Sequence, residues 1–368
     1  MIRRRFIAAL GAAALLVSAA AAGSPTCAGD SRLLSWPTGS PLWELCWVRP
    51  ASSSGPSGSG LEIHDVYYRG RLVLKRGHVP ILNVDYDPNG CGCFRDWLYS
   101  EKTYRTENEL APGYFEPPYP PETVCDHAIW PDTPPGDCPW GGPGPCQDGV
   151  SAEHEADSVT LTTETSAGWY RYAMRWTFHR DGTIEPTFGF GTYNTSCSGA
   201  THRHHAYWRL DFDVDGADGD TASQDGVPFA LEATSTWGDG TVRWQVRDDA
   251  SGLGYEIIPG AQDLLLAADD FSHLDFMVSL FHPGQYSDTG FSCDINAASI
   301  ADGEPVAGSD LVVWYRGGVE DRVGEDILLC KTAGPILAPL GDWAGGTIFG
   351  DGFESGDMSA WSSSAGGR

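Results

Sequence analysis

The chain is poor in basic residues. Its 368 residues include 23 Lys or Arg against 50 Asp or Glu, so the formal net charge is −27. Nucleic-acid binding draws most of its affinity from neutralised phosphates, and this deficit therefore argues against a nucleic-acid partner. It also argues against docking on anionic lipid. An acidic surface instead attracts cations, including protonated amines.

Methionine and long apolar runs are scarce as well. The chain holds 4 Met but 46 Gly, 25 Pro and 14 Trp, a composition typical of short strands and many turns rather than of a helical bundle. After residue 22 no apolar run reaches the roughly 18 residues that a membrane-spanning helix needs. We therefore expect no membrane span in that part of the chain.

The N-terminus has the pattern of an export signal. Arg3–Arg5 precede the apolar run Phe6–Val17, and Ala20–Ala22 supply small residues for cleavage. We expect residues 1–22 to be a signal peptide and the protein to be secreted or periplasmic. The arginines also fit a twin-arginine signal, although an ordinary basic segment is the simpler interpretation. All ten cysteines follow this segment, and an even count in an exported chain predicts disulfides.

Composition divides the remaining chain into three parts. Residues 23–59 are rich in Ser, Gly and Pro around an aromatic island, which predicts an extended N-terminal segment or linker. Residues 60–343 carry strand-like runs separated by turn signals, which predicts one all-β domain, a large antiparallel β-sandwich. Within it, residues 112–149 are so dense in Pro, Gly and Cys that disulfides must hold them. Residues 344–368 are Gly- and Ser-rich and predict a tail.

Alternation with period two marks three strands. In Trp169–Phe178 the even positions are apolar or aromatic, so Tyr170 belongs to a buried face. Trp208–Val214 alternates in the same way, and the same parity continued backwards puts His202 and His204 on the inward face. Leu311–Arg316 predicts a buried central strand.

His202 and His204 form an H-x-H pair. Two imidazoles on one face of a strand lie about 6–7 Å apart along the chain, which suits two ligands of one Cu(II) or Zn(II) ion. A solvated histidine cluster without a metal is the alternative. Tyr170, likewise, is either functional or an ordinary core tyrosine.

The residues around these positions resemble copper amine oxidases. His202-x-His204-x4-Arg209-Leu210-Asp211-x-Asp213-Val214-Asp215-Gly216 resembles the copper-binding segment of that family, and Tyr170-Arg171-Tyr172-x3-Trp176-x-Phe178-x2-Asp181-Gly182 resembles its quinone-forming segment. Other similar segments, in family order across roughly residues 60–343, are Gly60–Tyr68, Tyr255–Gly260, His282-Pro283 and Asp310–Tyr315 with Gly318-Val319.

The resemblance implies a fold and an activity. The family's catalytic domain is a large β-sandwich, usually dimeric, in which copper and oxygen convert a buried tyrosine to topaquinone. It oxidises a primary amine to an aldehyde with release of ammonia and hydrogen peroxide, and an aspartate acts as general base. Carried over, Tyr170 is the topaquinone precursor, and His202 and His204 are copper ligands. A small cationic amine is then the substrate, and a homodimer is the expected assembly.

Two family positions are occupied differently here. Trp169 replaces the asparagine that precedes the family's tyrosine, and Asp321 stands where the third copper histidine is expected. Asp321 is therefore the predicted third ligand, with His205 or His282 as alternatives. A carboxylate would change the charge and redox poise of the site.

The general base has two alignments. Asp96 matches the family's aspartate if Phe94-Arg95-Asp96 is the base segment. Alternatively, Gly90–Cys93 matches a later cysteine-containing element and the base segment is missing; Cys125 would then pair with Cys93 or Cys91. Cys138 is expected to pair locally or with Cys146.

Three functions remain open from the sequence. The first is a secreted, quinone-dependent primary-amine oxidase. The second is a catalytically inactive relative that acts as an exported metal- or ligand-binding sandwich. The third, an unrelated carbohydrate-binding sandwich, depends only on the abundance of tryptophan and would place several tryptophans on an exposed face.

Overall fold

Regular structure in this chain is almost entirely β-strand. The computed structural model describes residues 23–86, 91–101, 150–168, 170–192, 197, 199–238, 240–261, 263, 274–286, 295–322 and 332–344. Within them lie 18 strands and two short 3-10 helices, η1 (Pro50–Ser52) and η4 (Ala297–Ser299). None of the helices in these residues is long and apolar enough to cross a membrane.

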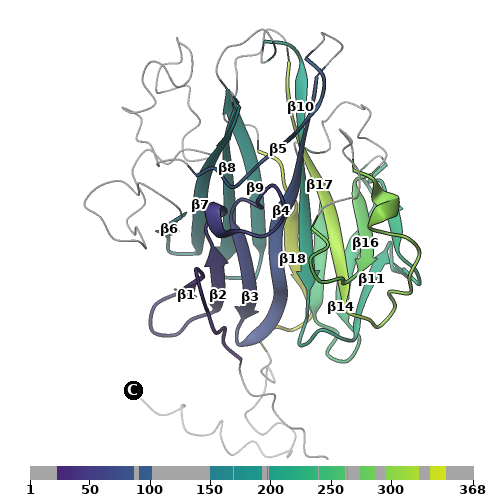
Figure 1. The fold of residues 1–368 in the computed structure, drawn as a ribbon. Coiled ribbons are helices and arrows are strands. Elements are labelled where there is room, and N and C mark those ends of the chain that lie inside the picture. The colour runs from purple at the N-terminus through teal and green to yellow at the C-terminus, as the bar shows by residue number, and fades with distance from the viewer. Residues whose placement is uncertain are drawn as a thin grey trace, which may run out of the picture.

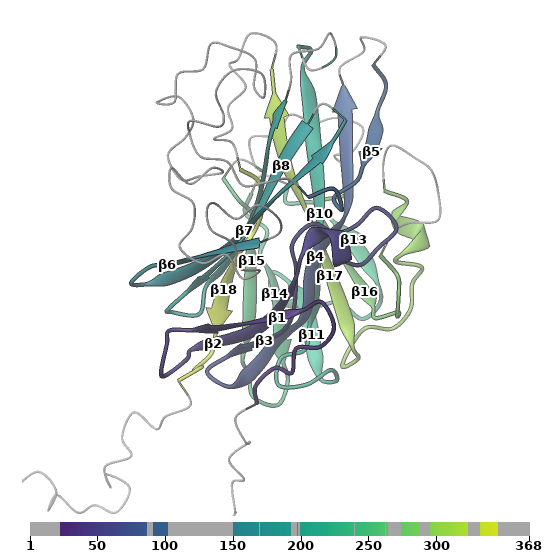
Figure 2. The same cartoon turned by 60° about the vertical axis from the view of Figure 1, so that its left-hand side comes forward.

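The strands form two antiparallel sheets packed face to face (Figures 1 and 2). The first sheet contains, in spatial order, β1 (Arg32–Trp36), β2 (Trp43–Val48), β3 (Glu62–Tyr68), β4 (Arg71–Tyr86), β10 (His202–Phe212), β17 (Leu311–Asp321), β16 (Phe276–Leu280) and β13 (Ala233–Ser235), with β5 (Phe94–Asp96) paired to β4. The second contains β12 (Val227–Pro228), β11 (Asp220–Gln224), β14 (Trp244–Asp248), β15 (Gly254–Ile258), β18 (Ile336–Leu340), β9 (Ile184–Thr192), β8 (Tyr170–His179), β7 (Ser158–Ala167) and β6 (Val150–His154). The predicted β-sandwich is confirmed.

The main core lies between the sheets. Trp176 of β8 and Trp208 of β10 come from opposite sheets and meet edge to face, with ring centroids 5.2 Å apart. Tyr170, Tyr172 and the other even positions of β8 are buried, as the period-two pattern predicts. Trp169 itself lies outside the described residues.

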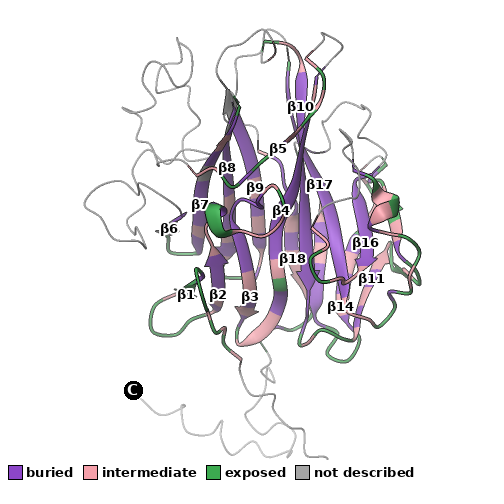
Figure 3. Ribbon diagram, in the orientation of Figure 1, coloured by how far each residue is buried: buried purple, intermediate pink, exposed green. Residues whose placement is uncertain are grey.

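β10 is buried along its whole length (Figure 3). Alternation predicted that only one face would be covered. The outer face is covered as well, because a second apolar cluster packs there, which contains Tyr207 of β10, Trp314 of β17 and Ile300 beside η4. β17 lies between β10 and β16, which agrees with the predicted central strand.

The N-terminal segment forms part of the first sheet. β1 pairs with β2, and β2 pairs with β3. Trp43 and Leu45 are fully buried, and the indole of Trp43 donates to the carbonyl of His179 at 2.7 Å. The aromatic island is therefore core, which the Ser/Gly/Pro-rich composition of 23–59 concealed.

Two disulfides join described cysteines, Cys27–Cys46 and Cys91–Cys197. The second excludes the alternative pairing of Cys91 with Cys125. Cys93 is also disulfide-bonded. Cys125, Cys138 and Cys146 lie outside the described residues, as do residues 1–22 and 345–368.

Candidate functional site

Tyr170 and the two predicted metal ligands meet between the sheets. Tyr170 begins β8 in the second sheet, and His202 and His204 open β10 in the first. The Tyr170 ring lies edge-on to His204 at 4.5 Å and 5.6 Å from His202, between ring centroids. The two imidazoles lie 5.3 Å apart by the same measure. The three side chains point inward from strands of opposite sheets, and they therefore share one interior space.

A second tyrosine holds Tyr170. Tyr86, the last residue of β4, pairs directly with His202 in the sheet, and its ring stacks on that imidazole at 5.3 Å. Its hydroxyl shares a hydrogen bond of 2.6 Å with the hydroxyl of Tyr170. Tyr86 is not among the residues predicted from the sequence. The available signal was its parity, because it alternates inward with the buried Leu82 and Val84.

The environment keeps both imidazoles neutral. Burial lowers the pKa of His202 to about 4 and the pKa of His204 well below its ordinary value. Nδ1 of His202 donates to the carbonyl of Ala200 at 2.7 Å, which leaves Nε2 with its lone pair. In the described part of the chain, neither Nε2 of His202 nor either nitrogen of His204 has a hydrogen-bond partner. Buried, neutral and unpartnered imidazole nitrogens are the donors that a copper ion requires.

Asp321 lies next to His202 but does not close a three-ligand set. It is the direct neighbour of His202 across the β10–β17 pair, and its Oδ2 lies 3.9 Å from Nε2. The ligand atoms of His202, His204 and Asp321 do not all lie within 4.8 Å of one another. The residues thus fit a metal by donor type and partly by position, and one side chain must turn for all three to reach the same ion.

The alternative third ligands are engaged elsewhere. His205 has the opposite parity to His204, and its Nδ1 lies 3.1 Å from a guanidinium nitrogen of Arg316. Nε2 of His282 lies 2.6 Å from a carboxylate oxygen of Glu304. Asp321 is therefore the better candidate.

Asp96 reaches the same interior from β5. It pairs with Leu82 of β4, and the hydroxyl of Tyr172 donates a hydrogen bond to its Oδ2. Burial raises the pKa of Asp96 to about 6, against the lowering effect of that hydrogen bond. A carboxyl with this proton affinity can exchange a proton near neutral pH.

Two further groups of carboxylates are present among the described residues. Asp211, Asp213 and Asp310 form one close group, and Glu232, Asp302 and Glu304 form another. Neither group includes a residue of the candidate site around Tyr170. Asp215, which follows the first group along the chain, has φ 60°, a left-handed conformation that Asp adopts in tight turns.

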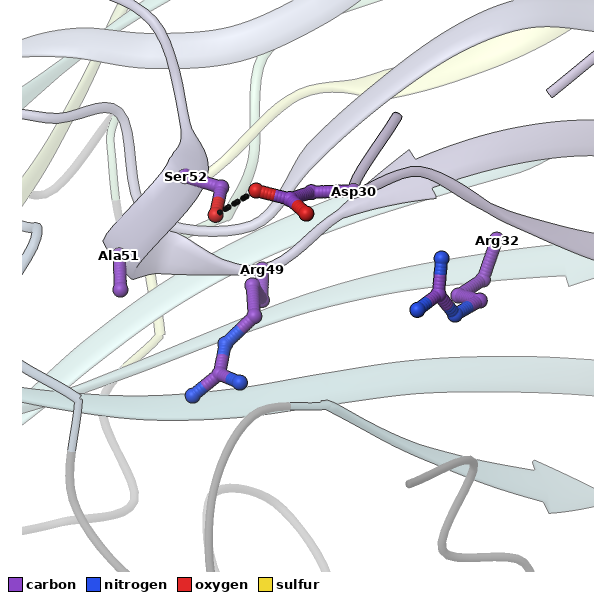
Figure 4. Close-up of a pocket in the computed structure, with 5 residues that line it drawn as sticks. All are labelled: Asp30, Arg32, Arg49, Ala51 and Ser52. Atoms are coloured by element: carbon purple, nitrogen blue, oxygen red, sulfur yellow. Dashed lines mark hydrogen bonds between the residues drawn. The ribbon is translucent and has the colours of Figure 1, made fainter. Parts of the chain in front are cut away.

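A surface pocket lies on the N-terminal hairpin (Figure 4). Its volume is about 320 Å³, and Asp30, Arg32, Arg49, Ala51 and Ser52 line it. The side chains of Asp30 and Ser52 are joined by a 2.8 Å hydrogen bond, as the dashed line shows. None of the candidate site residues lines this pocket, so it belongs to a different part of the surface.

Solved amine oxidases share this backbone arrangement. The chain is similar to an amine oxidase from Aspergillus nidulans, with a TM-score of 0.54 and 15% identity over 90% of this chain and 55% of that one. It is similar to a copper-containing benzylamine oxidase from Hansenula polymorpha, with a TM-score of 0.57 and 14% identity over 85% and 61%. For a lysyl oxidase from Pichia pastoris the values are 0.52 and 14% over 82% and 52%.

These likenesses concern the fold. The chain covers between half and two thirds of the length of those enzymes. No family model and no curated protein sequence matches it. The fold predicted from the resemblance to copper amine oxidases is nevertheless confirmed over most of the chain.

Proposed function

We propose that this protein oxidises primary amines at a quinone formed from Tyr170 beside a copper ion. The proposal depends chiefly on one observation: the Tyr170 hydroxyl is hydrogen-bonded to Tyr86 and its ring faces two unpartnered, neutral imidazoles. The reaction takes an amine, oxygen and water to an aldehyde, ammonia and hydrogen peroxide. When bound, copper supplies the oxygen chemistry that converts the tyrosine, and the quinone accepts electrons from the amine.

The chain's own residues have separate tasks in this proposal. His202 and His204, with Asp321, hold the metal. Tyr86 orients the ring at position 170, and Asp96 accepts a proton from the substrate. The surplus of acidic residues attracts a small cationic amine. The disulfides suit an oxidising compartment outside the cytoplasm, and a homodimer is the proposed assembly.

The test is copper loading in air. The purified chain is analysed for metal, titrated with phenylhydrazine for a reactive carbonyl, and assayed for peroxide with a primary amine. We expect one carbonyl per chain and amine-dependent peroxide in the wild type, and neither in Tyr170→Phe. Tyr255→Phe is the matched control, because it removes another buried hydroxyl, bonded to the Gly182 carbonyl at 3.0 Å. Equal peroxide from wild type and Tyr170→Phe would exclude the mechanism.

A second function is favoured by the incomplete ligand set. The ligand atoms of His202, His204 and Asp321 are not all within 4.8 Å of one another. The alternative is therefore a catalytically inactive relative of the amine oxidases that binds a metal or another ligand. It predicts bound metal without a reactive carbonyl in the same experiment. The carbohydrate-binding hypothesis predicts several exposed tryptophans, and Trp97 is the one exposed tryptophan among the described residues.

A further inference from the structure

A hydrogen bond joins the two sheets beside Tyr170. Tyr172 lies on the same face of β8, and its ring stacks on that of Tyr170 with centroids 5.8 Å apart. Its hydroxyl donates to Oδ2 of Asp96, which belongs to β5 in the opposite sheet. Tyr172 is fully buried and Asp96 is 9% exposed. The bond therefore fixes the Asp96 carboxyl relative to the strand that carries Tyr170.

Tyr172 is the polar partner of Asp96 in the described part of the chain. The neighbouring guanidinium of Arg95 instead donates to the side chain of Asn83 at 3.0 Å. The other titratable groups near the pair are the phenols of Tyr86 and Tyr170, together with the His204 imidazole, 5.5 Å from the Tyr172 ring. Within the described residues, no cation offsets the cost of burying the Asp96 charge.

The direction of this hydrogen bond is fixed. Burial raises the pKa of Tyr172 well above its ordinary value, so the phenol keeps its proton and stays the donor. Asp96 accepts that bond at Oδ2, and its Oδ1 accepts no hydrogen bond from the described residues. Oδ2 is therefore held by Tyr172, and Oδ1 remains able to accept a proton.

On the basis of the proposed function, we propose that Tyr172 is a positioning residue for Asp96: its hydroxyl holds Oδ2 so that Oδ1 receives the proton removed from the amine. The proton leaves the carbon next to the amine nitrogen and forms the O–H bond at Oδ1. A quinone formed from Tyr170 would supply the acceptor for the electron pair of the broken C–H bond. Tyr172 itself touches neither the proton nor the pair.

The first test needs neither metal nor substrate. Full-length protein with ¹³C-labelled aspartate is titrated by NMR as wild type and as Tyr172→Phe, and Asp96→Asn assigns the signal. Phenylalanine keeps the burial and removes the hydrogen bond, so the pKa of Asp96 should rise by about one unit or more. Tyr255→Phe removes a buried hydroxyl elsewhere in the same sheet and should leave that pKa in place. An unchanged pKa in Tyr172→Phe would overturn the proposal.

The second test uses the copper-loaded protein. Tyr172→Phe should lower kcat about tenfold or more with little change in KM, because a base that is less well oriented affects the chemical step. The acid limb of the pH profile should also move to higher pH, since Asp96 must be ionised to accept a proton. Wild-type activity in Tyr172→Phe would overturn the positioning role. If the pKa of Asp96 rises in Tyr172→Phe but the wild type oxidises no amine, the proposed function is overturned and the positioning of Asp96 by Tyr172 is still supported.

Discussion

His202 and Asp321 face each other across neighbouring antiparallel strands, with Nε2 and Oδ2 3.9 Å apart. This separation is too long for a hydrogen bond. It is close to the spacing of two ligands that each lie about 2.0–2.2 Å from one ion. The pair is therefore the part of the candidate metal site that the backbone register itself fixes.

Replacing Asp321 should change copper binding in both directions. Asp321→Asn removes the anionic oxygen, and we expect copper affinity to fall about tenfold or more, in line with what loss of supporting groups costs metal sites. Asp321→His adds a third imidazole and should raise the affinity. Isothermal titration of the apo-protein with Cu(II), with metal analysis, measures both.

Glu320→Gln is the control for these variants. Glu320 is the adjacent carboxylate on β17 and bonds to Arg203 at 3.0 Å and Arg322 at 2.9 Å. The side chain of Glu320 points to the opposite face of β17 from that of Asp321. Neutralising Glu320 should therefore leave copper affinity unchanged. An equal loss in Glu320→Gln and Asp321→Asn would point to a general charge effect and remove Asp321 from the ligand set.

The Tyr86–Tyr170 hydrogen bond should appear as a coupling energy. Unfolding free energies of Tyr86→Phe, Tyr170→Phe and the double variant form a double-mutant cycle. We expect a coupling of about 0.5–1.5 kcal/mol, the usual value for a net hydrogen bond. A cycle that pairs Tyr86 with Tyr255, whose hydroxyl bonds to the Gly182 carbonyl, is the reference and should show none. A Tyr86–Tyr170 coupling no larger than this reference would mean that the bond is not formed in solution.

Local patterns predicted the site's strands but not their neighbours. Period two placed Tyr170, His202 and His204 on inward faces, because side-chain direction in a strand depends only on parity. Tyr86 was missed because its meeting with Tyr170 depends on which strands pair and on how the sheets face each other, and neither follows from one strand's pattern. Asp321 was found only through the family resemblance, although its register with His202 shows a purely structural reason for its position.

Burial was harder to predict than direction. The alternation in Trp208–Val214 indicated one covered face, yet Arg209 and Asp211 on the other face are also buried. The outer cluster that covers this side includes Ile295 and Ile300, which are distant in sequence from β10. Residues 23–59 show a related effect, since β2 pairs with β3, a partner that the composition of the segment does not indicate.

The Cys91–Cys197 disulfide should stabilise the site as well as the fold. It joins the segment after Tyr86 to the segment before His202, across a sequence separation of 106 residues. Chain entropy predicts a loss of about 4–5 kcal/mol on removal by paired serine substitution. Cys27–Cys46 spans 19 residues, for which the same relation predicts about 3 kcal/mol, and it lies at the N-terminal edge. Urea unfolding measures both losses, and copper affinity should fall only in the Cys91/Cys197 variant. Equal copper binding in the two variants would contradict a link to the site.

Stability should fall as the pH rises through neutrality. Burial, aided by neighbouring carboxylates, raises the pKa of Asp213 to about 7, and burial raises that of Asp220 to about 8. Between the unfolded pKa of 3.8 and these values the folded state binds more protons than the unfolded chain. Their contribution to stability is therefore complete at acid pH and is lost as the pH rises through about 7 to 8. Buried His202 acts in the opposite sense, because its pKa of about 4 penalises folding only below its ordinary value of 6.5.

A measurement from pH 6.5 upwards thus isolates the carboxylates from His202. Urea unfolding near pH 6.5 and two units above it should give a smaller unfolding free energy at the higher pH. Asp213→Asn and Asp220→Asn should each reduce this difference, because an asparagine side chain has no charge to develop. The Val214 N–H donates to the Asp220 carboxylate at 3.0 Å, and in Asp220→Asn the amide oxygen can still accept this bond. Asp157→Asn is the control, since that side chain is 89% exposed and should leave the difference unchanged. If the wild type is equally stable at both pH values, the pKa values of Asp213 and Asp220 are not raised in the folded protein, and this prediction is wrong.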